Sequence, residues 1–204
     1  MMKDFCVLID NGHGVDTLGK RSPEHFTERV YEWEYTRKIA ERLSCELSKR
    51  NIRNVIVTPE DKDVCLSTRA SRVNKLCSQY DCILISIHVN AAQKDDTGTG
   101  FEVFSTKAKT NSDVLANIFV CEFSEEFPFE RNRGHKQCDW TILYKSKCPC
   151  VLTENFFMNN RRDVHLMLSE KGFESIVRYH LNSVTEYMRK MNKRPSPPEK
   201  IKHI

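Results

Sequence analysis

The chain has 204 residues, a length that fits one domain built around a single hydrophobic core. Hydrophobic residues make up 39% of it and gather in short runs, which argues against disorder over most of the chain. No run approaches the roughly 20 apolar residues of a membrane-spanning helix, so we expect no membrane span. The formal net charge of +4 is mildly basic, which fits either an anionic partner or an ordinary solvated surface.

The N-terminal segment, MMKDFCVLID, has one lysine before a short apolar run that stops at an aspartate. It lacks the long apolar region and small-residue cleavage site of a signal peptide, so we interpret it as a first strand. With no export signal, the nine cysteines predict free thiols in a reducing compartment. Cys148-Pro149-Cys150 has the wrong spacing for a CxxC clamp, which disfavours a cysteine zinc site.

The first half of the chain alternates between strand-like and helix-like segments, at residues 5–10, 30–50, 54–58, 67–79 and 82–90. Asn11-Gly12-His13-Gly14 ends the first strand with turn-forming residues. Leucines and isoleucines at four-residue steps predict the first helix, and Ser67 is the expected N-cap of the second. The segment CILISIHVN is a near-continuous apolar run, which is typical of a strand buried on both faces of a parallel sheet.

The second half continues the pattern with a strand at 101–105, a helix at 112–127, a polar loop at 128–140 and a strand at 150–153. One or two helices follow over residues 162–191, with an interruption expected at Gly172. This alternation predicts an α/β fold, a single domain with a mostly parallel central sheet of about five or six strands and helices on both faces. We assign residues 1–192 to that domain and residues 193–204, which are rich in proline and lysine, to a flexible tail.

Three chemically useful side chains follow predicted strands. His13 comes after the first strand, His88 lies at the end of the apolar run, and Glu154 follows the last strand. If those strands are parallel neighbours, their carboxyl ends meet at one edge of the sheet, where open α/β sheets bind ligands. Nitrogen and oxygen ligands with one open position suit a catalytic zinc ion, and a carboxylate that is not a ligand can act as general base.

Five segments of the chain match the motifs of a known family, and in order they read DNGHGVDTLGK, EWEYTRKIAERL, LISIHVNA, GTGFEVFS and VLTENFFMNN. From about residue 5 to about residue 190 the chain resembles the zinc-dependent N-acetylmuramoyl-L-alanine amidases of the amidase 3 type. The resemblance implies one Zn²⁺ ion and hydrolysis of the peptidoglycan amide between the lactoyl group of N-acetylmuramic acid and L-alanine. The chain departs from the family pattern at Val15, where glycine is usual, and at Asn159, where serine is usual.

The family motifs also imply the roles of individual residues. His13 in GHG, Glu32 in the helical segment and His88 in SIHVNA match the zinc ligands, and Glu154 matches the catalytic general base and acid. The family pattern places the helical ligand four residues before a small polar position, which selects Glu32. Glu34 remains the alternative ligand, although it would point some 200° away around the helix.

Substrate contacts are expected from Asn90, Arg133 and His135. The arginine could bind a carboxylate of the stem peptide, and the histidine lies in the predicted loop before the last strand. Asp10, Asn11 and Asn90 are near enough in sequence to orient the two histidine ligands.

Two other functions stay open, namely a different zinc peptidase or amidohydrolase that acts on the stem peptide and a non-catalytic peptidoglycan-binding domain. The presence of Glu154 together with all three ligands disfavours a binding domain, which needs no general base. We expect a monomer without a nucleic-acid partner. We also expect a protein made in the cytoplasm that reaches the cell wall by endolysin-like release or by another export route.

Overall fold

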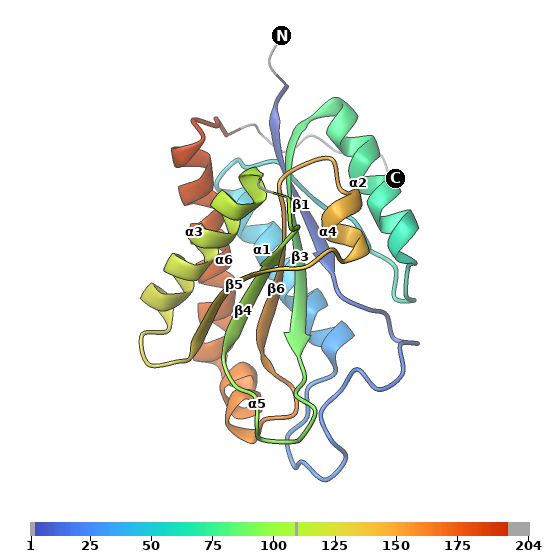
Figure 1. Ribbon diagram of the computed structural model, residues 1–204, viewed down its shortest axis with the longest axis vertical. Helices are drawn as coiled ribbons and strands as arrows, with labels where there is room; N and C mark the ends of the chain where they lie inside the picture. The colour runs from blue at the N-terminus through green and yellow to red at the C-terminus, as the bar shows by residue number, and fades with distance from the viewer. Residues whose placement is uncertain (1–2, 109, 196–204) are drawn as a thin grey trace.

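The computed structural model describes residues 3–108 and 110–195 (Figure 1). Within these ranges, six strands form one sheet in the order β2-β1-β3-β6-β4-β5. The strands are β1 Phe5–Asn11, β2 Asn54–Ile56, β3 Asp81–Asn90, β4 Phe101–Ser105, β5 Asn132–Gln137 and β6 Cys150–Phe157. The helices of the same ranges are α1 Glu32–Lys49, α2 Leu66–Gln79, α3 Asn111–Glu126, α4 Thr141–Lys145, α5 Arg161–Leu168 and α6 Glu170–Lys190. The predicted α/β domain with a mostly parallel sheet is confirmed.

Strand direction brings the ends of the central strands together. β1 pairs in parallel with β2 and β3, and β3 pairs in parallel with β6. β4 runs antiparallel to β6, and the edge strand β5 is parallel to β4. Since β1, β3 and β6 are adjacent and share one direction, their carboxyl ends lie at the same edge of the sheet, where β3 ends in the lower half of Figure 1.

Helices cover both faces of the sheet, as the alternation of strands and helices predicts. Val7 and Ile9 of β1 pack in a large hydrophobic cluster with residues of α1, α3, α5 and α6. Cys6 and Leu8, which point to the other face, belong to a smaller cluster with residues of α2 and α4. Each fully buried aliphatic side chain contributes roughly 1.5–3 kcal/mol, so these two clusters hold the three layers together. In Figure 1, α3 and α6 lie on one side of the sheet and α2 and α4 on the other.

Two predictions about strands are wrong. Residues 128–140 are not all loop, because they contain β5, whose polar sequence NRGHKQ is half-exposed at the edge of the sheet. The last strand does not end before Glu154 but continues to Phe157. Glu154 and Asn155 extend the strand because both have partners on neighbouring strands, which a pattern of hydrophobicity cannot reveal.

Two predictions about helix ends are also wrong. Ser67 is not the N-cap of α2, because the helix begins at Leu66 and Cys65 occupies the cap. The break near the end of the chain lies at Ser169 rather than at Gly172, and Ser169 caps α6 by accepting a hydrogen bond from the Gly172 amide at 3.0 Å. A Cβ at Gly172 would lie 1.9 Å from the carbonyl oxygen of Leu166, so close packing requires glycine here.

The end of the expected tail, residues 196–204, lies outside the described residues. Lys193, the first residue of that tail, forms an ion pair with Asp81 at 2.5 Å. No helix within the described ranges is both long enough and apolar enough to cross a membrane.

Candidate active site

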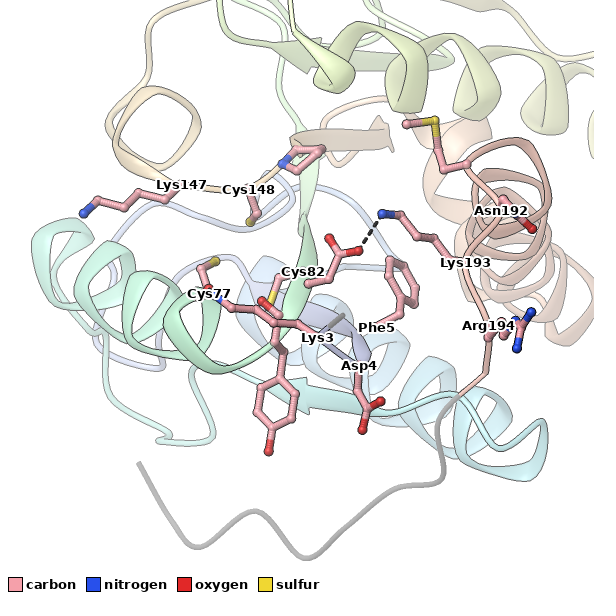
Figure 2. A pocket seen from close by; sticks show the side chains of 14 residues that line it. Lys3, Asp4, Phe5, Cys77, Cys82, Lys147, Cys148, Asn192, Lys193 and Arg194 are labelled. Carbon is pink, nitrogen blue, oxygen red and sulfur yellow. Dashed lines mark hydrogen bonds and ion pairs between the residues drawn. The ribbon is translucent and has the colours of Figure 1, made fainter. Parts of the chain in front are cut away.

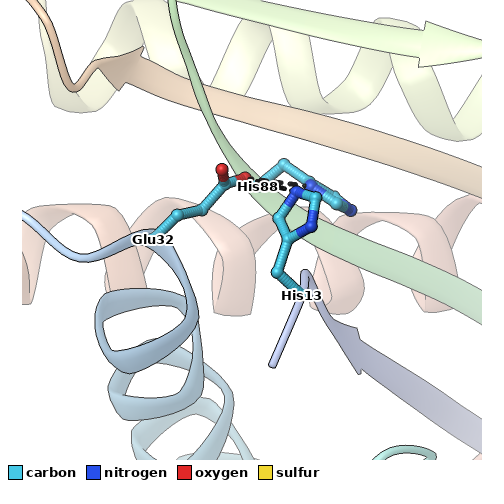
Figure 3. A group of neighbouring side chains, drawn as sticks. All are labelled: His13, Glu32 and His88. Atoms are coloured by element: carbon cyan, nitrogen blue, oxygen red, sulfur yellow. Dashed lines mark hydrogen bonds and ion pairs between the residues drawn. The ribbon is translucent and has the colours of Figure 1, made fainter. Parts of the chain in front are cut away.

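His13, Glu32 and His88 converge at the carboxyl edge of the sheet (Figure 3). The Glu32 Oε1 atom lies 3.4 Å from His13 Nε2 and 3.1 Å from His88 Nδ1. The two imidazole rings are nearly perpendicular, at 89°, with centroids 5.2 Å apart. One ligand atom from each side chain lies within 4.8 Å of the others, and no other group of three such side chains in the described part of the chain does so. These three side chains could therefore share a metal ion.

The glycines on either side of His13 leave room for close neighbours, namely the His88 ring at Gly12 and the backbone of Asp63 at Gly14. A Cβ at Gly12 would lie 2.5 Å from the His88 ring, and one at Gly14 would lie 2.0 Å from the Asp63 backbone nitrogen. His13 itself has a φ of 64°, in the left-handed region that non-glycine residues rarely adopt. Strained backbone of this kind persists where the surrounding structure holds it, and it is common at functional sites.

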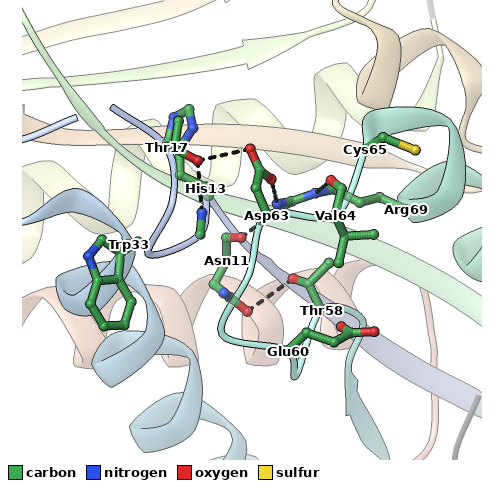
Figure 4. Close-up of polar contacts among 12 residues, drawn as sticks. Asn11, His13, Thr17, Trp33, Thr58, Glu60, Asp63, Val64, Cys65 and Arg69 are labelled. Carbon is green, nitrogen blue, oxygen red and sulfur yellow. Dashed lines mark hydrogen bonds and ion pairs between the residues drawn. The ribbon is translucent and has the colours of Figure 1, made fainter. Parts of the chain in front are cut away.

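Hydrogen bonds from a neighbouring loop hold the backbone that carries His13 (Figure 4). The Thr17 hydroxyl accepts from the Gly14 amide at 3.1 Å and donates to Asp63 at 2.9 Å. Arg69, which is buried on α2, donates to Asp63 at 2.7 Å and to the Asn11 carbonyl oxygen at 2.8 Å. The loop is thus connected to α2 as well as to β1, which limits the movement of the His13 side chain.

Glu32 is the first residue of α1, and its buried position beside two histidines determines the pKa and the partners of its carboxyl. Burial alone would raise the pKa of the Glu32 carboxyl, but hydrogen bonds and charge from His13 and His88 outweigh it and hold the pKa well below the usual range. The Val89 amide also donates to Oε1 at 3.1 Å. Oε2 is buried and has no hydrogen-bond partner in the described structure, so a cation could satisfy it. Glu34 lies elsewhere on α1 and pairs with Lys38 at 2.6 Å, so the geometry favours Glu32.

Glu154 on β6 lies directly opposite His88 on β3, so the two side chains share one face of the sheet. Burial is the main cause that raises the pKa of Glu154 to about 8; charge on Glu32 and Glu102 adds to the shift, and His88 and Lys20 oppose it. Its Oε2 atom is buried with no hydrogen-bond partner among the described residues. A buried carboxyl that can hold a proton near neutral pH is suited to general acid–base chemistry.

A groove of about 480 Å³ opens over this group. His13, His88 and Glu154 form part of its wall. The N-terminal ends of α2 and α4 supply several apolar lining residues, namely Val64, Leu66, Trp140 and Ile142. A substrate in this groove would reach both the His–Glu–His group and the Glu154 carboxyl.

Arg133 lies beside this group rather than in the groove wall. On β4, Glu102 is the cross-strand partner of Glu154, and its buried carboxylate accepts from Arg133 Nε and pairs with Lys136 at 2.7 Å. The Arg133 guanidinium also lies 5.2 Å from the centre of the Phe157 ring. Two cations therefore gather next to the strand that carries Glu154.

The structure does not bring His135 to the group. Its ring lies 2.7 Å from the Ser105 hydroxyl and 3.6 Å from the Asp113 carboxylate of α3, on the opposite face of the sheet. Asn90 lies two residues after His88 on β3, and its side-chain oxygen accepts from the Ala91 amide at 2.8 Å. Neither residue lines the groove.

Asp10 and Asn11 do not orient the histidines as expected. The buried Asp10 carboxylate accepts from Arg69 at 2.8 Å and from Ser86 at 2.6 Å. The side-chain oxygen of Asn11 accepts from Thr58 at 3.1 Å. These hydrogen bonds connect β1 to α2, to β3 and to the segment after β2, behind the site.

Sequence reasoning missed several residues of the site, including Lys20, Arg69, Glu102 and Trp140. Glu102 is in the segment GTGFEVFS, but its place beside Glu154 depends on the antiparallel register of β4 and β6. Trp140 could have been suspected, because a tryptophan in a polar stretch often has a surface role. Lys20 and Arg69 have no local sequence pattern that distinguishes them from charged residues on a solvent-exposed surface.

Comparison with known proteins shows which family this chain belongs to. The sequence profile of a family described as N-acetylmuramoyl-L-alanine amidase matches residues 7–186. The chain belongs to the N-acetylmuramoyl-L-alanine amidase family.

Individual relatives show the same likeness. The chain is 27% identical over 185 residues to the N-acetylmuramoyl-L-alanine amidase CwlM of Bacillus licheniformis, covering 87% of this chain and 66% of that protein. It is 25% identical over 190 residues to an endolysin of Bacillus phage SPP1, covering 89% of this chain and 65% of the endolysin. The crystal structure of an N-acetylmuramoyl-L-alanine amidase from Clostridium difficile 630 superposes with a TM-score of 0.82 at 28% identity, covering 92% of this chain and 98% of that one. This amidase-family chain thus spans just under two thirds of the length of the first and second of these relatives.

Proposed function

We propose that this chain is a zinc-dependent peptidoglycan amidase that cleaves the amide between the lactoyl group of N-acetylmuramic acid and the L-alanine of the stem peptide. The observation that carries the proposal is the meeting of His13, Glu32 and His88 beside the buried carboxyl of Glu154, at the edge of an amidase-family fold. The similarity to an endolysin supports action at the bacterial cell wall.

The three proposed ligands fit Zn²⁺. Two imidazoles and a carboxylate are the donor set of many catalytic zinc sites, which keep a fourth position open. With bonds of about 2.0–2.1 Å, the ligand atoms of a tetrahedral zinc ion lie about 3.3 Å apart. The separations of 3.4 Å and 3.1 Å from Glu32 Oε1 to the two rings are close to that value. When bound, the ion supplies Lewis acidity to the scissile carbonyl group and makes water a usable nucleophile near neutral pH.

Glu154 performs the proton transfers in this proposal. Its carboxylate takes a proton from the attacking water and later returns it to the alanine nitrogen, which leaves as a neutral amine. The raised pKa of Glu154 fits the second step, because it favours the protonated carboxyl that acts as the acid. His88 faces Glu154 across the strand pair and fixes the distance between the ligand group and the general base.

The surrounding residues suit a substrate with both apolar and acidic parts. Trp140 and Leu66 line the groove and can pack against a sugar ring or the lactoyl methyl group. Arg133 and Lys136, which share the Glu102 carboxylate, can bind a carboxylate of the stem peptide. Of the expected substrate contacts, Arg133 is therefore the one that we retain.

Digestion of purified peptidoglycan tests the reaction. We expect mass spectrometry to find intact stem peptides that begin with a free L-alanine, together with glycan strands that have lost them. Fragments cut within the stem peptide would contradict the proposal, and so would tight binding of peptidoglycan without any product.

The Glu154→Gln variant tests the assignment of the general base. Because general acid–base catalysis contributes roughly 10²–10⁴-fold, we expect a loss of kcat of about that size. Bound zinc, measured by elemental analysis, should stay at the wild-type level, since Glu154 is not a proposed ligand. Wild-type turnover in this variant would overturn the role given to Glu154.

A further inference from the structure

A second cavity, of about 810 Å³, lies at the end of the sheet away from the active site (Figure 2). It is lined by residues at the beginning of β1 and β3, by the C-terminal end of α2, and by the segments before β6 and after α6. Three of its lining residues are cysteines, namely Cys77, Cys82 and Cys148. The proposed amidase reaction uses none of them.

The side chain of Asn74 holds two of these cysteines near each other. Its amide nitrogen donates to the Lys145 carbonyl oxygen at 2.9 Å, and its oxygen accepts from the Lys147 amide at 2.8 Å. Cys77 follows Asn74 by nearly one helical turn on α2, and Cys148 follows Lys147 directly. Figure 2 shows the Cys77 and Cys148 side chains pointing toward one another at the cavity.

Cys77 has the surroundings of a reactive thiol. Hydrogen bonding with Cys148 and with Cys82 lowers the pKa of the Cys77 thiol below its usual range, and the positive charge of Lys3 adds to this shift against the effect of burial. The Lys3 ammonium group is held there by a hydrogen bond to the Cys77 carbonyl oxygen at 2.9 Å. Cys77 and Cys148 are both partly accessible to solvent, so a small reagent can reach them.

Cys82 is a poorer partner for Cys77. It is 3% exposed, and its thiol donates to the Tyr80 carbonyl oxygen at 3.6 Å. It also lies opposite Cys6 in the β1–β3 ladder, inside the smaller hydrophobic cluster. Attack by an external thiol or disulfide is therefore hindered at this sulfur.

We propose that Cys77 and Cys148 are a redox-active thiol pair that closes to an intramolecular disulfide between α2 and the segment before β6. The oxidant is a small-molecule disulfide. The Cys77 thiolate attacks one of its sulfurs, so that a mixed disulfide forms and one thiolate leaves. Cys148 then loses its proton to solvent and attacks the Cys77 sulfur, and the second thiolate leaves. Two protein thiols are oxidised and one small disulfide is reduced to two thiols.

The Lys3 ammonium group, held by its hydrogen bond to the Cys77 carbonyl oxygen, favours a thiolate at Cys77 and so makes Cys77 the first to react. Hydrogen bonding to Cys77 is the main cause that raises the pKa of the Cys148 thiol, burial is the next, and negative charge on Cys150 and Cys77 contributes as well. Once the Cys77 sulfur is part of a mixed disulfide, it no longer carries that charge. Cys148 can then ionise more readily and complete the reaction.

Disulfide mapping of the full chain tests this inference and needs no measurement of amidase activity. The reduced protein is incubated with oxidised glutathione, the remaining thiols are alkylated with N-ethylmaleimide, and the protein is digested without reduction. We expect mass spectrometry to find Cys77 linked to Cys148, with neither of these two residues alkylated. A link between Cys82 and either Cys6 or Cys77 as the main product would overturn the proposal, as would retention of all free thiols.

Single variants separate the two roles. In Cys148→Ser we expect Cys77 to keep one attached glutathione, and in Cys77→Ser we expect Cys148 to stay reduced. Cys45→Ser and Cys121→Ser serve as matched controls, because both residues are exposed on other helices, and they should form the wild-type link. Circular dichroism establishes that each variant is folded. A folded Cys77→Ser variant in which Cys148 takes up glutathione as fast as Cys77 does in Cys148→Ser would contradict the assignment.

Discussion

Glu32 and Glu34 are two residues apart on the same helix, yet their surroundings differ in every respect that matters for metal binding. The Glu32 side chain is 1% exposed and faces two imidazoles, whereas the Glu34 side chain is 46% exposed and pairs with a lysine. A buried carboxylate with an unpartnered oxygen loses free energy unless a cation or a donor satisfies it. The surface ion pair of Glu34 is worth at most about 1 kcal/mol.

Paired variants at these positions test the ligand assignment. In Glu32→Gln we expect zinc affinity to fall by more than about 100-fold, because even the loss of an outer-shell partner costs about 10- to 100-fold. In Glu34→Gln, the matched control, we expect affinity to stay within about twofold. Competition with a chromogenic chelator measures both. Equal losses in the two variants would mean that the helix contributes charge rather than a ligand.

The sequence predicts the part of the candidate site whose side chains adjoin or follow apolar strands. His13 and His88 adjoin buried hydrophobic runs, and Glu154 follows another, so their convergence required only parallel neighbouring strands. Glu102 and Arg133 could not be placed in this way. Their positions depend on the antiparallel insertion of β4 and on a polar edge strand, and both features are determined by tertiary pairing rather than by local pattern.

At the scale of elements, α6 supports the strand that carries the proposed general base. Thr153 and Asn155, on either side of Glu154, are buried on the opposite face of the sheet, toward α6. The Asn155 side-chain nitrogen donates to the His88 carbonyl oxygen at 2.8 Å, and the Tyr179 hydroxyl of α6 donates to the Asn155 side-chain oxygen. This chain of hydrogen bonds connects α6, β6 and β3 at the point where Glu154 faces His88.

Removal of the Tyr179 hydroxyl tests this connection. Tyr179→Phe leaves the buried Asn155 oxygen without that donor, so we expect a loss of about 1–3 kcal/mol in the free energy of unfolding. Tyr144→Phe removes a hydroxyl from a tyrosine that is 54% exposed on α4, and it should change stability by less than about 0.5 kcal/mol. Urea denaturation of both variants and of wild type measures the free energies of unfolding. Equal stability of Tyr179→Phe and wild type would show that the hydrogen bond makes no net contribution.

His180, the next residue on α6, makes the attachment of this helix sensitive to pH. Its Nδ1 lies 2.8 Å from the Ile176 carbonyl oxygen and its Nε2 lies 3.1 Å from the Thr153 hydroxyl, a pattern that fits the neutral imidazole. Burial lowers the pKa of His180 to about 4, against about 6.5 in an unfolded chain. The unfolded state therefore binds the extra proton between these values, and stability that is fully present above pH 6.5 is lost as the pH falls toward 4.

The His180→Gln variant isolates this contribution. We expect wild type to be the more stable protein at pH 7 and its advantage to shrink by on the order of 3 kcal/mol at pH 4, because the unfolded state is then protonated at this position and the folded state resists protonation. Urea denaturation of both proteins at several pH values measures the difference, in which the other titrating groups cancel. An advantage that is constant with pH would mean that His180 is protonated, or water-accessible, in the folded state.

At the scale of the whole molecule, the alternation of strands and helices predicts the architecture. Strands that are buried on both faces, such as β1 and β3, have near-continuous apolar sequences that are easy to recognise. The three proposed ligands come from parts of the chain that are distant in sequence, namely the loop after β1, the start of α1 and the end of β3. An unfolded chain does not hold these residues together, so an ion bound by all three is bound by the native state alone. Its binding free energy then adds to the stability of the whole fold.

Thermal unfolding with and without zinc measures this coupling. At a free zinc concentration of 100 times Kd, one native-state site contributes about 2.7 kcal/mol. For a domain of about 200 residues this raises Tm by about 5–10 °C, since each kcal/mol is worth about 2–4 °C. The chelator EDTA should reverse the shift, and His88→Ala, which removes one ligand, should show a shift of less than about 2 °C. A full shift in that variant would place the zinc at another site, because two remaining side chains cannot hold the ion as tightly as three.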